Sequence, residues 1–376
     1  MSTLKVDAIR HNSATSDAIT TAADGTCTAK LTSVGGGQLS HRNLIINGAM
    51  NVAQRGVTST ATGHGTVDRF AVYHSTDDAP TQSQSDVGLS DLPFTEQGIT
   101  KCLKVTNGNQ SGAGNAEYVE INYKCEAQDI RNSGWNYQSS SSFITLSYYV
   151  RSSVAQTFTA WITNRDGTRK NFVWSYALSA NTWTKITKVI PGDSGLTINN
   201  DNGAAIELWF QMFYGTNYSQ ASPPGNNTGG WVNHDNQTVE TNDTSWYLTN
   251  DATFEITGVQ LEVGNHATSF EHRSFADELA RCQRYYEETY VMTDAGNSYV
   301  RVPVLYKVEK RAVGTPVSYA KRPDGVGTGA ANKAYQADGE RTASCNYSWT
   351  GGTMLFVSGY SANTDCFSNI RVNAEL

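Results

Sequence analysis

Two short motifs in this 376-residue sequence carry residue types that could perform catalysis or bind an ion. "GDSG" at Gly192–Gly195 matches the motif around the nucleophile of serine proteases, but none of the seven histidines stands in a context that supplies the general base. "NNDNG" at Asn199–Gly203 is similar to a calcium loop, yet Ile198 occupies the position where the first carboxylate is required. We therefore expect turns at both motifs.

The remaining polar motifs are also poor candidates for chemistry. His266 and His272 are six residues apart and share no helical face, and "GVGTGA" at Gly325–Ala330 does not open a helix after a strand, as a phosphate-binding loop does. Carboxylate pairs for glycoside hydrolysis depend on the fold and not on spacing, and no Asp/Glu cluster suggests one. We expect no enzyme activity, no cofactor and no metal site. Without a C-x-x-C pair, most of the six cysteines are expected to be free, buried thiols: Cys27, Cys102, Cys125, Cys282, Cys345 and Cys366.

Aromatic residues near Asn, Asp and Gln suggest a different chemistry, because proteins hold sugars with ring faces and fix the hydroxyl groups with amides and carboxylates. One group lies on segments expected to be loops or short strands near the C-terminus: Tyr335, Asn346, Tyr347, Trp349, Tyr360 and Asp365. A second group lies in the long polar segment between Gly215 and Trp246: Tyr218, Trp231, His234 and Trp246. The structural alternatives stay open. Trp231 and Trp246 would then pin their segment to a sheet or to a neighbouring subunit, and Trp349 and Tyr360 would fill a small core.

The elements that must position these residues are mostly strands. Aromatic-bearing stretches such as "FITLSYYVRS" and "AIELWFQMFYG" recur with turn residues between them, and "FTAWITNRDGTRKNFVWSYAL" reads as a hairpin around Asp166-Gly167. No helical segments separate them, which indicates an antiparallel sandwich or jelly roll. We expect a mainly β chain with an N-terminal arm (1–40) ending in a Gly35–Gly37 hinge, a sandwich (41–273), a helix (274–291) and a C-terminal β domain (292–376).

The helix is the one departure from this strand pattern. Ser274 suits an N-cap and Asp277 completes a capping-box pattern. One face is predicted to be apolar at helical spacing, and we expect it to form the contact between three copies of the chain near an axis: Phe275, Leu279, Cys282 and Tyr286.

Composition limits the partners. Charged residues make up 17% of the chain, the net charge is −7 and the pI is near 5.5, so a phosphate-binding, nucleic-acid surface is not expected. No apolar run approaches the ~20 residues that span a bilayer, so membrane insertion is not expected. The N-terminal "MSTLKVDAIRHNS" has no apolar central region, and we expect no secretory signal.

Several long segments carry a resemblance to a known family. "RNLIINGAMNVAQRG" at Arg42–Gly56, followed by "VDRF", resembles the opening of a β-sandwich module of bacteriophage tail fibres. "GVQLEVGNHATSFEHRSFADELARCQRYYE" at Gly258–Glu287 is similar to its closing strand and the helix after it. "KRAVGTPVSY" at Lys310–Tyr319 and the terminal "NIRVNAEL" resemble the distal domain, and residues 2–26 resemble the virion-attachment end of marine and cyanobacterial phage fibres.

This resemblance implies an elongated homotrimer made in the host cytoplasm and located in the virion. Its N-terminal arm would bind a tail protein (an adaptor, nozzle or baseplate component), and its distal end a bacterial surface polysaccharide. On that geometry the C-terminal aromatic group is favoured over Trp231 and Trp246. Two alternatives stay open: a head fibre or other virion decoration protein with the same modules, and a tailspike-like glycan depolymerase. The chain lacks the internal period typical of the long β-helices of such depolymerases.

Overall fold

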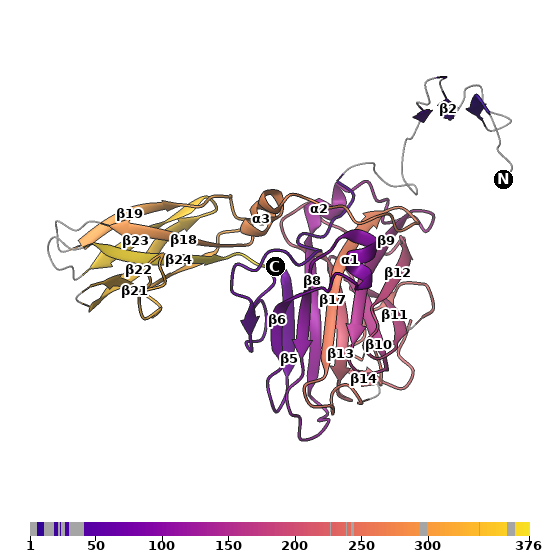
Figure 1. Ribbon diagram of the computed structural model, residues 1–376, viewed down its shortest axis with the longest axis horizontal. Helices are drawn as coiled ribbons and strands as arrows, with labels where there is room; N and C mark the ends of the chain where they lie inside the picture. Colours follow the sequence, from indigo (N-terminus) through magenta and orange to yellow (C-terminus); the bar gives the residue numbers. More distant parts are fainter. Residues whose placement is uncertain are drawn as a thin grey trace.

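The computed structural model describes residues 6–10, 19–21, 23, 27–29, 41–225, 227–237, 239–241, 244–293, 299–337, 339–358 and 365–376. Figure 1 shows a large sandwich and a smaller β domain that projects from its side, with a short helix at the junction. In the N-terminal arm, three short strands pair antiparallel: β1 (Ala8–Ile9), β2 (Ile19–Thr21) and β3 (Cys27–Ala29). The expected Gly35–Gly37 hinge lies outside the described residues.

Two six-stranded sheets form the sandwich. The first sheet has the order β15 (Val232–Asn233), β11 (Lys170–Leu178), β10 (Gln156–Asn164), β13 (Ala204–Tyr214), β8 (Tyr118–Glu126) and β5 (Phe70–Ser75). The second has the order β12 (Thr184–Pro191), β9 (Phe143–Ser152), β17 (Thr253–Val263), β7 (Lys101–Thr106), β6 (Thr81–Asp86) and β4 (Thr58–Ser59). The pairs within both sheets are antiparallel.

The sandwich forms because one face of each strand is apolar. In β10, Phe158, Ala160 and Ile162 enter the core, whereas the residues between them face outward. The chain crosses repeatedly between the two sheets, as in a jelly roll. The expected mainly β sandwich is therefore confirmed.

Two of the three helices within the described residues border the sandwich. The first, α1 (Leu92–Gln97), places Leu92 and Phe94 against a small cluster on the outer face of the second sheet that includes Tyr149 and Trp183. The second, α2 (Ala127–Arg131), continues from the end of β8 and buries Ile130 in the main core. These helices close the outer face of one sheet and one end of the core.

The C-terminal domain is one seven-stranded sheet with its own core. Its order is β18 (Tyr286–Thr293), β24 (Cys366–Asn373), β21 (Lys333–Gln336), β22 (Gly339–Trp349), β23 (Gly352–Ser358) and β19 (Tyr299–Leu305), with β20 (Thr315–Tyr319) also paired to β24. Eight buried residues, including Leu355, Val357 and Ile370, form the core.

The connecting helix is shorter than the sequence predicts. Ser274 caps it by accepting a hydrogen bond from the Asp277 backbone N–H at 3.2 Å, as expected. However, α3 spans Phe275–Gln283, and β18 begins at Tyr286 and pairs antiparallel with β24 over its whole length. The predicted end near residue 291 is wrong, because pairing with a strand about 80 residues away in the sequence decides the conformation there.

The C-terminal segment Ala374–Leu376 returns from β24 to the sandwich and forms an ionic joint there. Glu375 is 6% exposed and forms ion pairs with Arg69, which is fully buried, and with Arg55 at 3.2 Å. The Arg69 guanidinium lies over the ring of Tyr285 at 3.4 Å, and Lys124 donates a hydrogen bond to the Leu376 carbonyl at 2.9 Å. The distal domain is thus held to the sandwich by the backbone at α3 and by this segment.

A second buried ion pair supports the base of the distal domain. Lys310 Nζ lies 2.6 Å from Glu287 Oε2, both side chains are fully buried, and Lys310 also donates to the carbonyls of Gln283 and Val308. Nearby, Arg284 Nε donates to Glu126 of the sandwich at 2.8 Å. None of the helices in the described part of the chain is both long and apolar enough to cross a bilayer.

Candidate functional site

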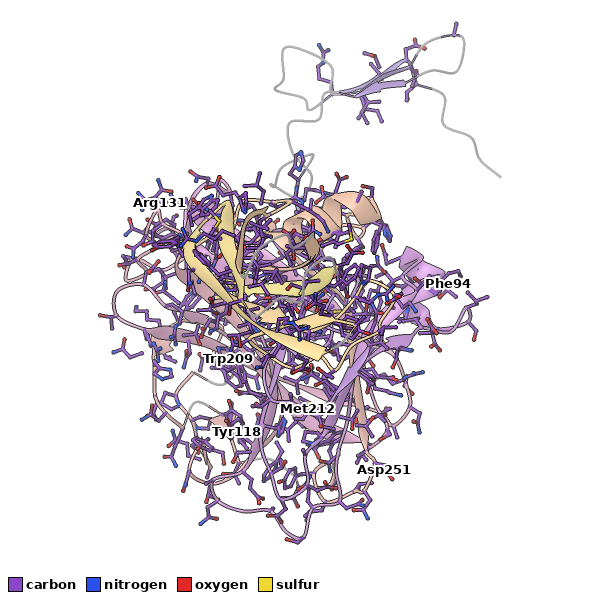
Figure 2. The ribbon with its side chains drawn as sticks, turned by 90° about the vertical axis from the view of Figure 1, so that its left-hand side faces the viewer. Phe94, Tyr118, Arg131, Trp209, Met212 and Asp251 are labelled. Carbon is purple, nitrogen blue, oxygen red and sulfur yellow. The ribbon has the colours of Figure 1, made fainter. Side chains whose placement is uncertain are left out.

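Outward-facing residues of two central strands form the most chemically specific surface of the sandwich. On β10 these are Thr159, Trp161 and Thr163, and on β13 they include Glu207, Trp209 and Gln211. Strand register places them in facing pairs, Thr159 with Gln211, Trp161 with Trp209 and Thr163 with Glu207. Figure 2 shows Trp209 and Tyr118 on one side of the sandwich and Phe94 on the other.

The two tryptophans form a parallel pair. Their ring centroids are 5.7 Å apart and the rings are inclined by only 8°. Tyr214 meets Trp161 edge-on at 5.7 Å, and Tyr218 meets Tyr214 at the same distance. Trp161 is 4% exposed, whereas Trp209 and Tyr214 are half-buried. Trp161 therefore supports Trp209 from within, and Trp209 keeps part of its surface open.

A long loop covers one side of this surface and turns it into a pocket. The loop, residues 215–241, contains the parallel pair β14 (Ser219–Gln220) and β16 (Val239–Glu240), and Val239 is buried against Trp161. It contributes Tyr218, His234 and Asn236 to a pocket of about 210 Å³, whose other walls come from the sheet and from the β10–β11 hairpin. The size is that of a small site for one or two ring-shaped groups.

Buried polar groups on this face lack hydrogen-bond partners among the described residues. Both amide atoms of Gln211, which is fully buried, and Nε1 of Trp209 are unpaired. Glu207, 2% exposed, has ion-pair contacts with Lys124 at 3.6 Å and Arg165 at 3.4 Å, but its Oε2 accepts no hydrogen bond. An unpaired buried polar group costs about 1–3 kcal/mol. Trp209 and Glu207 line the pocket, so a ligand there would lie beside them, whereas Gln211 is not among the lining residues.

Burial also changes the ionisation of this face. Glu120 lies opposite Gln211 in register and accepts a hydrogen bond from the Tyr214 hydroxyl. Desolvation raises the pKa of Glu120 to about 8, and the charge of Glu207 adds to the effect. Burial, together with the positive charges of Arg169 and Arg165, lowers the pKa of His234. Near neutral pH, Glu120 is thus largely protonated and His234 neutral.

The sequence-predicted sugar ligands Trp231 and Trp246 do not belong to this pocket. Trp231 donates from Nε1 to the Pro191 carbonyl at 2.7 Å and packs edge-on against Phe172, and it is 8% exposed. Trp246 is fully buried and donates to the Thr253 carbonyl at 3.1 Å. Their prediction as sugar-binding residues is wrong, because both rings hold the loop to the sandwich, which was the structural alternative. Tyr218 and His234 of the same group do line the pocket.

The C-terminal group is divided between two ends of the distal sheet. Asn346, Tyr347 and Trp349 lie near the β22–β23 turn, where Trp349 faces Gly352, and Tyr347 is 81% exposed. Tyr335 and Asp365 lie at the opposite end, where Tyr335 pairs with Phe367 and Gln336 with Cys366. Tyr360 lies outside the described residues. The structure does not assemble these residues into one site.

The residues predicted to form the trimer contact are mostly buried within their own chain. Leu279 and Cys282 pack with Ile46 and Val52 of the sandwich, and Tyr286 is on strand β18 and 6% exposed. Phe275 is 60% exposed and Leu279 is only partly buried, so both keep surface that is free for a partner. The expected contact is wrong for Cys282 and Tyr286, which are buried, whereas for Phe275 and Leu279 it stays a prediction, as does the trimer itself.

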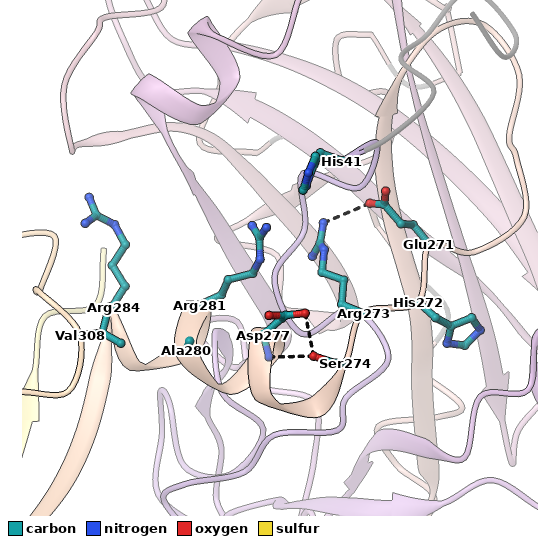
Figure 3. Close-up of a pocket in the computed structure, with 10 residues that line it drawn as sticks. All are labelled: His41, Glu271, His272, Arg273, Ser274, Asp277, Ala280, Arg281, Arg284 and Val308. Atoms are coloured by element: carbon teal, nitrogen blue, oxygen red, sulfur yellow. Dashed lines mark hydrogen bonds and ion pairs between the residues drawn. The ribbon is translucent and has the colours of Figure 1, made fainter. Parts of the chain in front are cut away.

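A larger groove of about 700 Å³ follows α3 (Figure 3), but most of its charged residues are already engaged in the fold. Arg273 donates to the Ile45 carbonyl at 3.0 Å and pairs with Glu271 at 3.3 Å. Arg284 pairs with Glu126, and Asp277 accepts from the hydroxyl of Ser274. This groove therefore reads as the seam between helix and sandwich.

The other sequence motifs have structural roles. Asp193 of "GDSG" accepts hydrogen bonds from Lys170 Nζ and from the Gly195 backbone, and Asp166 receives the backbone N–H of Asn199 at 2.8 Å. Both motifs are turns, as expected. Within the described residues, five cysteines are free: Cys102, Cys125, Cys282, Cys345 and Cys366.

The Trp161–Trp209 pair was missed in the sequence although a signal was present. Both tryptophans lie in strands at positions that alternate with core residues. The residues two positions away on either side are Thr for Trp161, and Glu and Gln for Trp209. Such an alternation predicts an outward-facing ring. The sequence prediction instead named the tryptophans of the polar segment, Trp231 and Trp246, as sugar-binding residues.

No protein-family model and no curated protein sequence matches the chain. Solved structures with related backbones include the enzymatically active domain of bacteriophage CBA120 tailspike protein 4, with a TM-score of 0.32 and 8% identity over 59% of this chain and 21% of that chain. A putative sugar binding protein from Bacteroides thetaiotaomicron has a TM-score of 0.30 and 12% identity over 59% of this chain and 99% of its own.

A family 11 carbohydrate-binding module from Clostridium thermocellum has a TM-score of 0.26 and 11% identity over 54% of this chain and 91% of its own. This chain covers about a fifth of the tailspike chain. At such TM-scores these similarities carry no argument about function. The functional case rests on the pocket of the first sheet, with its paired tryptophans and unpaired buried polar groups.

Proposed function

We propose that the protein binds a glycan in the pocket between the first sheet and the 215–241 loop, and that it does so as a virion attachment protein of the tail-fibre type. The observation that carries the glycan site is the parallel Trp161–Trp209 pair, which lines the pocket together with Glu207, whose Oε2 accepts no hydrogen bond. A half-exposed indole supplies an apolar face for a sugar ring, and amides and carboxylates fix its hydroxyl groups.

Binding without hydrolysis is the version we favour. Glu120 and Glu207 are the two buried carboxylates of this face. Glu120 pairs in register with Gln211 and Glu207 with Lys124, so the two carboxylates stand four residues apart along the paired strands. Glu207 lines the pocket, whereas Glu120 is not among the described residues that line it. Retaining glycosidases need carboxyl groups about 5 Å apart and inverting enzymes about 6.5–9.5 Å. A depolymerase acting at this pocket is therefore the weaker proposal.

The virion role rests on the sequence resemblance and on the arrangement of the chain. The sandwich and the distal domain have separate cores, joined by ion pairs and by a small apolar cluster, which suits an extended adhesin. On this proposal the N-terminal arm binds a tail protein and the sandwich pocket binds a bacterial surface polysaccharide. A head fibre or decoration protein would use the same pocket and differ only in where the arm attaches.

The test compares two tryptophans. Trp209→Ala should abolish binding of the purified protein to an array of bacterial surface polysaccharides, because stacking on an aromatic ring is the main apolar contact of the site. Trp349→Ala removes an indole that is 39% exposed on the distal domain and should leave binding unchanged. Circular dichroism and thermal unfolding establish that both variants fold. Loss of binding with Trp349→Ala and not with Trp209→Ala would move the site to the distal domain and contradict the proposal.

A further inference from the structure

The pocket of the first sheet is cationic in a chain whose net charge is −7. Among the described residues that line it, Arg165 and Arg169 carry positive charge, His234 is neutral near neutral pH, and Glu207 is the one acidic residue. Lys124 lies next to the pocket and contacts the same carboxylate at 3.6 Å. Two cations thus share Glu207, and positive charge remains at this end of the pocket.

The two arginines occupy fixed positions on one hairpin. Arg165 directly follows β10 and Arg169 directly precedes β11, with a turn between them in which Gly167 has a φ of 64°. Arg165 donates its backbone N–H to Ala205 at 2.8 Å, and the Arg169 carbonyl accepts from the His234 backbone at 2.9 Å. The guanidinium groups therefore project from an anchored backbone beside the aromatic wall.

Ion pairs within the described part of the chain do not neutralise both arginines of the pocket. Arg165 has its ion pair with Glu207 at 3.4 Å, whereas Arg169 has no ion-pair partner within the described part of the chain. The positive charges of Arg169 and Arg165 both act on His234, against the single nearby charge of Asp235. An anion in the pocket would be attracted by both arginines and would also favour the charged form of His234. Arginine also suits this role, since its planar group binds carboxylate or sulfate oxygens in pairs.

Resting on the proposed glycan site, we infer that its ligand is an acidic glycan, one whose sugars carry a carboxylate or sulfate group. The sugar ring lies against Trp209 and Tyr214, and the anionic substituent lies towards Arg169 and His234. An amino sugar is disfavoured, because Glu207 is already flanked by Lys124 and Arg165. Neutral glycans would use the aromatic wall alone and bind more weakly.

The experiment uses the full chain and an array that contains β-1,4-linked glucose, glucuronate, glucosamine and sulfated glucose oligomers beside bacterial polysaccharides of both charge classes. We expect acidic members to be bound in preference to neutral members with the same backbone. Arg169→Gln should weaken binding of acidic glycans about 3- to 10-fold, the range for one charge-assisted contact at a partly exposed site. It should weaken binding of neutral glycans less than binding of acidic glycans, because a neutral sugar lacks the charge that Arg169 contacts.

Arg281→Gln is the matched control, because it removes an exposed arginine on α3 outside the pocket and changes the net charge equally. Comparing the binding of carboxylated and sulfated oligomers identifies which anionic group the pocket prefers. Binding of neutral glycans only, lost with Trp209→Ala, would overturn this inference and leave the glycan site standing. Binding of acidic glycans that survives both Trp209→Ala and Arg169→Gln would overturn the site itself. Equal losses with Arg169→Gln and Arg281→Gln would reduce the effect to overall charge and also overturn the inference.

Discussion

Neutralising Glu375 tests whether the ionic joint holds the distal domain to the sandwich. In Glu375→Gln the shape of the side chain is kept, but Arg69, fully buried, loses its ion-pair partner. Desolvation by burial raises the pKa of Glu375, but the charges nearby, chiefly that of Arg69, outweigh it and lower the pKa from 4.5 to about 2. That difference corresponds to about 3 kcal/mol of stability at neutral pH.

Leaving Arg69 buried and unpaired brings the expected loss to about 3–5 kcal/mol. Because the pKa of Glu375 is lowered on folding, its contribution is complete above about pH 4.5 and is lost as the pH falls towards 2. The difference between wild type and variant should therefore shrink by about 2 kcal/mol between pH 7 and pH 3.

The assay is urea unfolding followed by tryptophan fluorescence at both pH values. Asp86→Asn is the control: it breaks the exposed ion pair with Lys101, where Asp86 is 82% exposed, and should cost less than about 1 kcal/mol. An unfolding midpoint for Glu375→Gln equal to that of Asp86→Asn would refute the reasoning. So would a large difference that does not change with pH, because it would indicate lost packing instead of lost charge.

Two further predictions concern buried charges. The pKa of Glu120 is raised to about 8, so the stability that its protonated form confers is present below about pH 4.5 and is lost as the pH rises through 8. Glu120→Gln should flatten this decline, measured as thermal unfolding midpoints from pH 5 to pH 8. An unchanged decline would exclude Glu120 as its cause. Lys310→Met leaves Glu287 buried without its cation and should lower the free energy of unfolding in urea by about 3–5 kcal/mol. Adding Glu287→Leu should recover most of that loss. Failure to recover it would show that packing, and not charge, dominates at this pair.

The strand pattern was sufficient to predict the sandwich and the position of the capped helix. It failed where the deciding partner is distant in sequence. Tyr286 fits the helical spacing, yet β18 pairs with β24. Likewise, Leu279 and Cys282 are covered by Ile46 and Val52. An apolar helical face predicts burial, but the sequence alone does not say whether the cover comes from the same chain or from another copy.

The candidate site was predicted only in part, for a similar reason. Tryptophans in a polar loop are expensive to expose, and this one fact fits both a binding site and an anchor. For Trp231 and Trp246 the anchor prevails, because their indole N–H groups find backbone carbonyls on the sandwich. Trp161 and Trp209 are recognised only once the register brings two strands together, which a single strand does not reveal.

The return of Ala374–Leu376 to the sandwich also has a mechanical consequence. The backbone between α3 and β18 and the joint around Glu375 both link the distal domain to the sandwich, and Arg311 adds a hydrogen bond to the Asn202 carbonyl at 2.7 Å. A single attachment would act as a swivel, whereas several attachments side by side resist rotation about the chain axis. Figure 1 shows α3 and the C-terminus on the side of the sandwich that faces the distal domain, so we expect the two parts to move as one stiff unit.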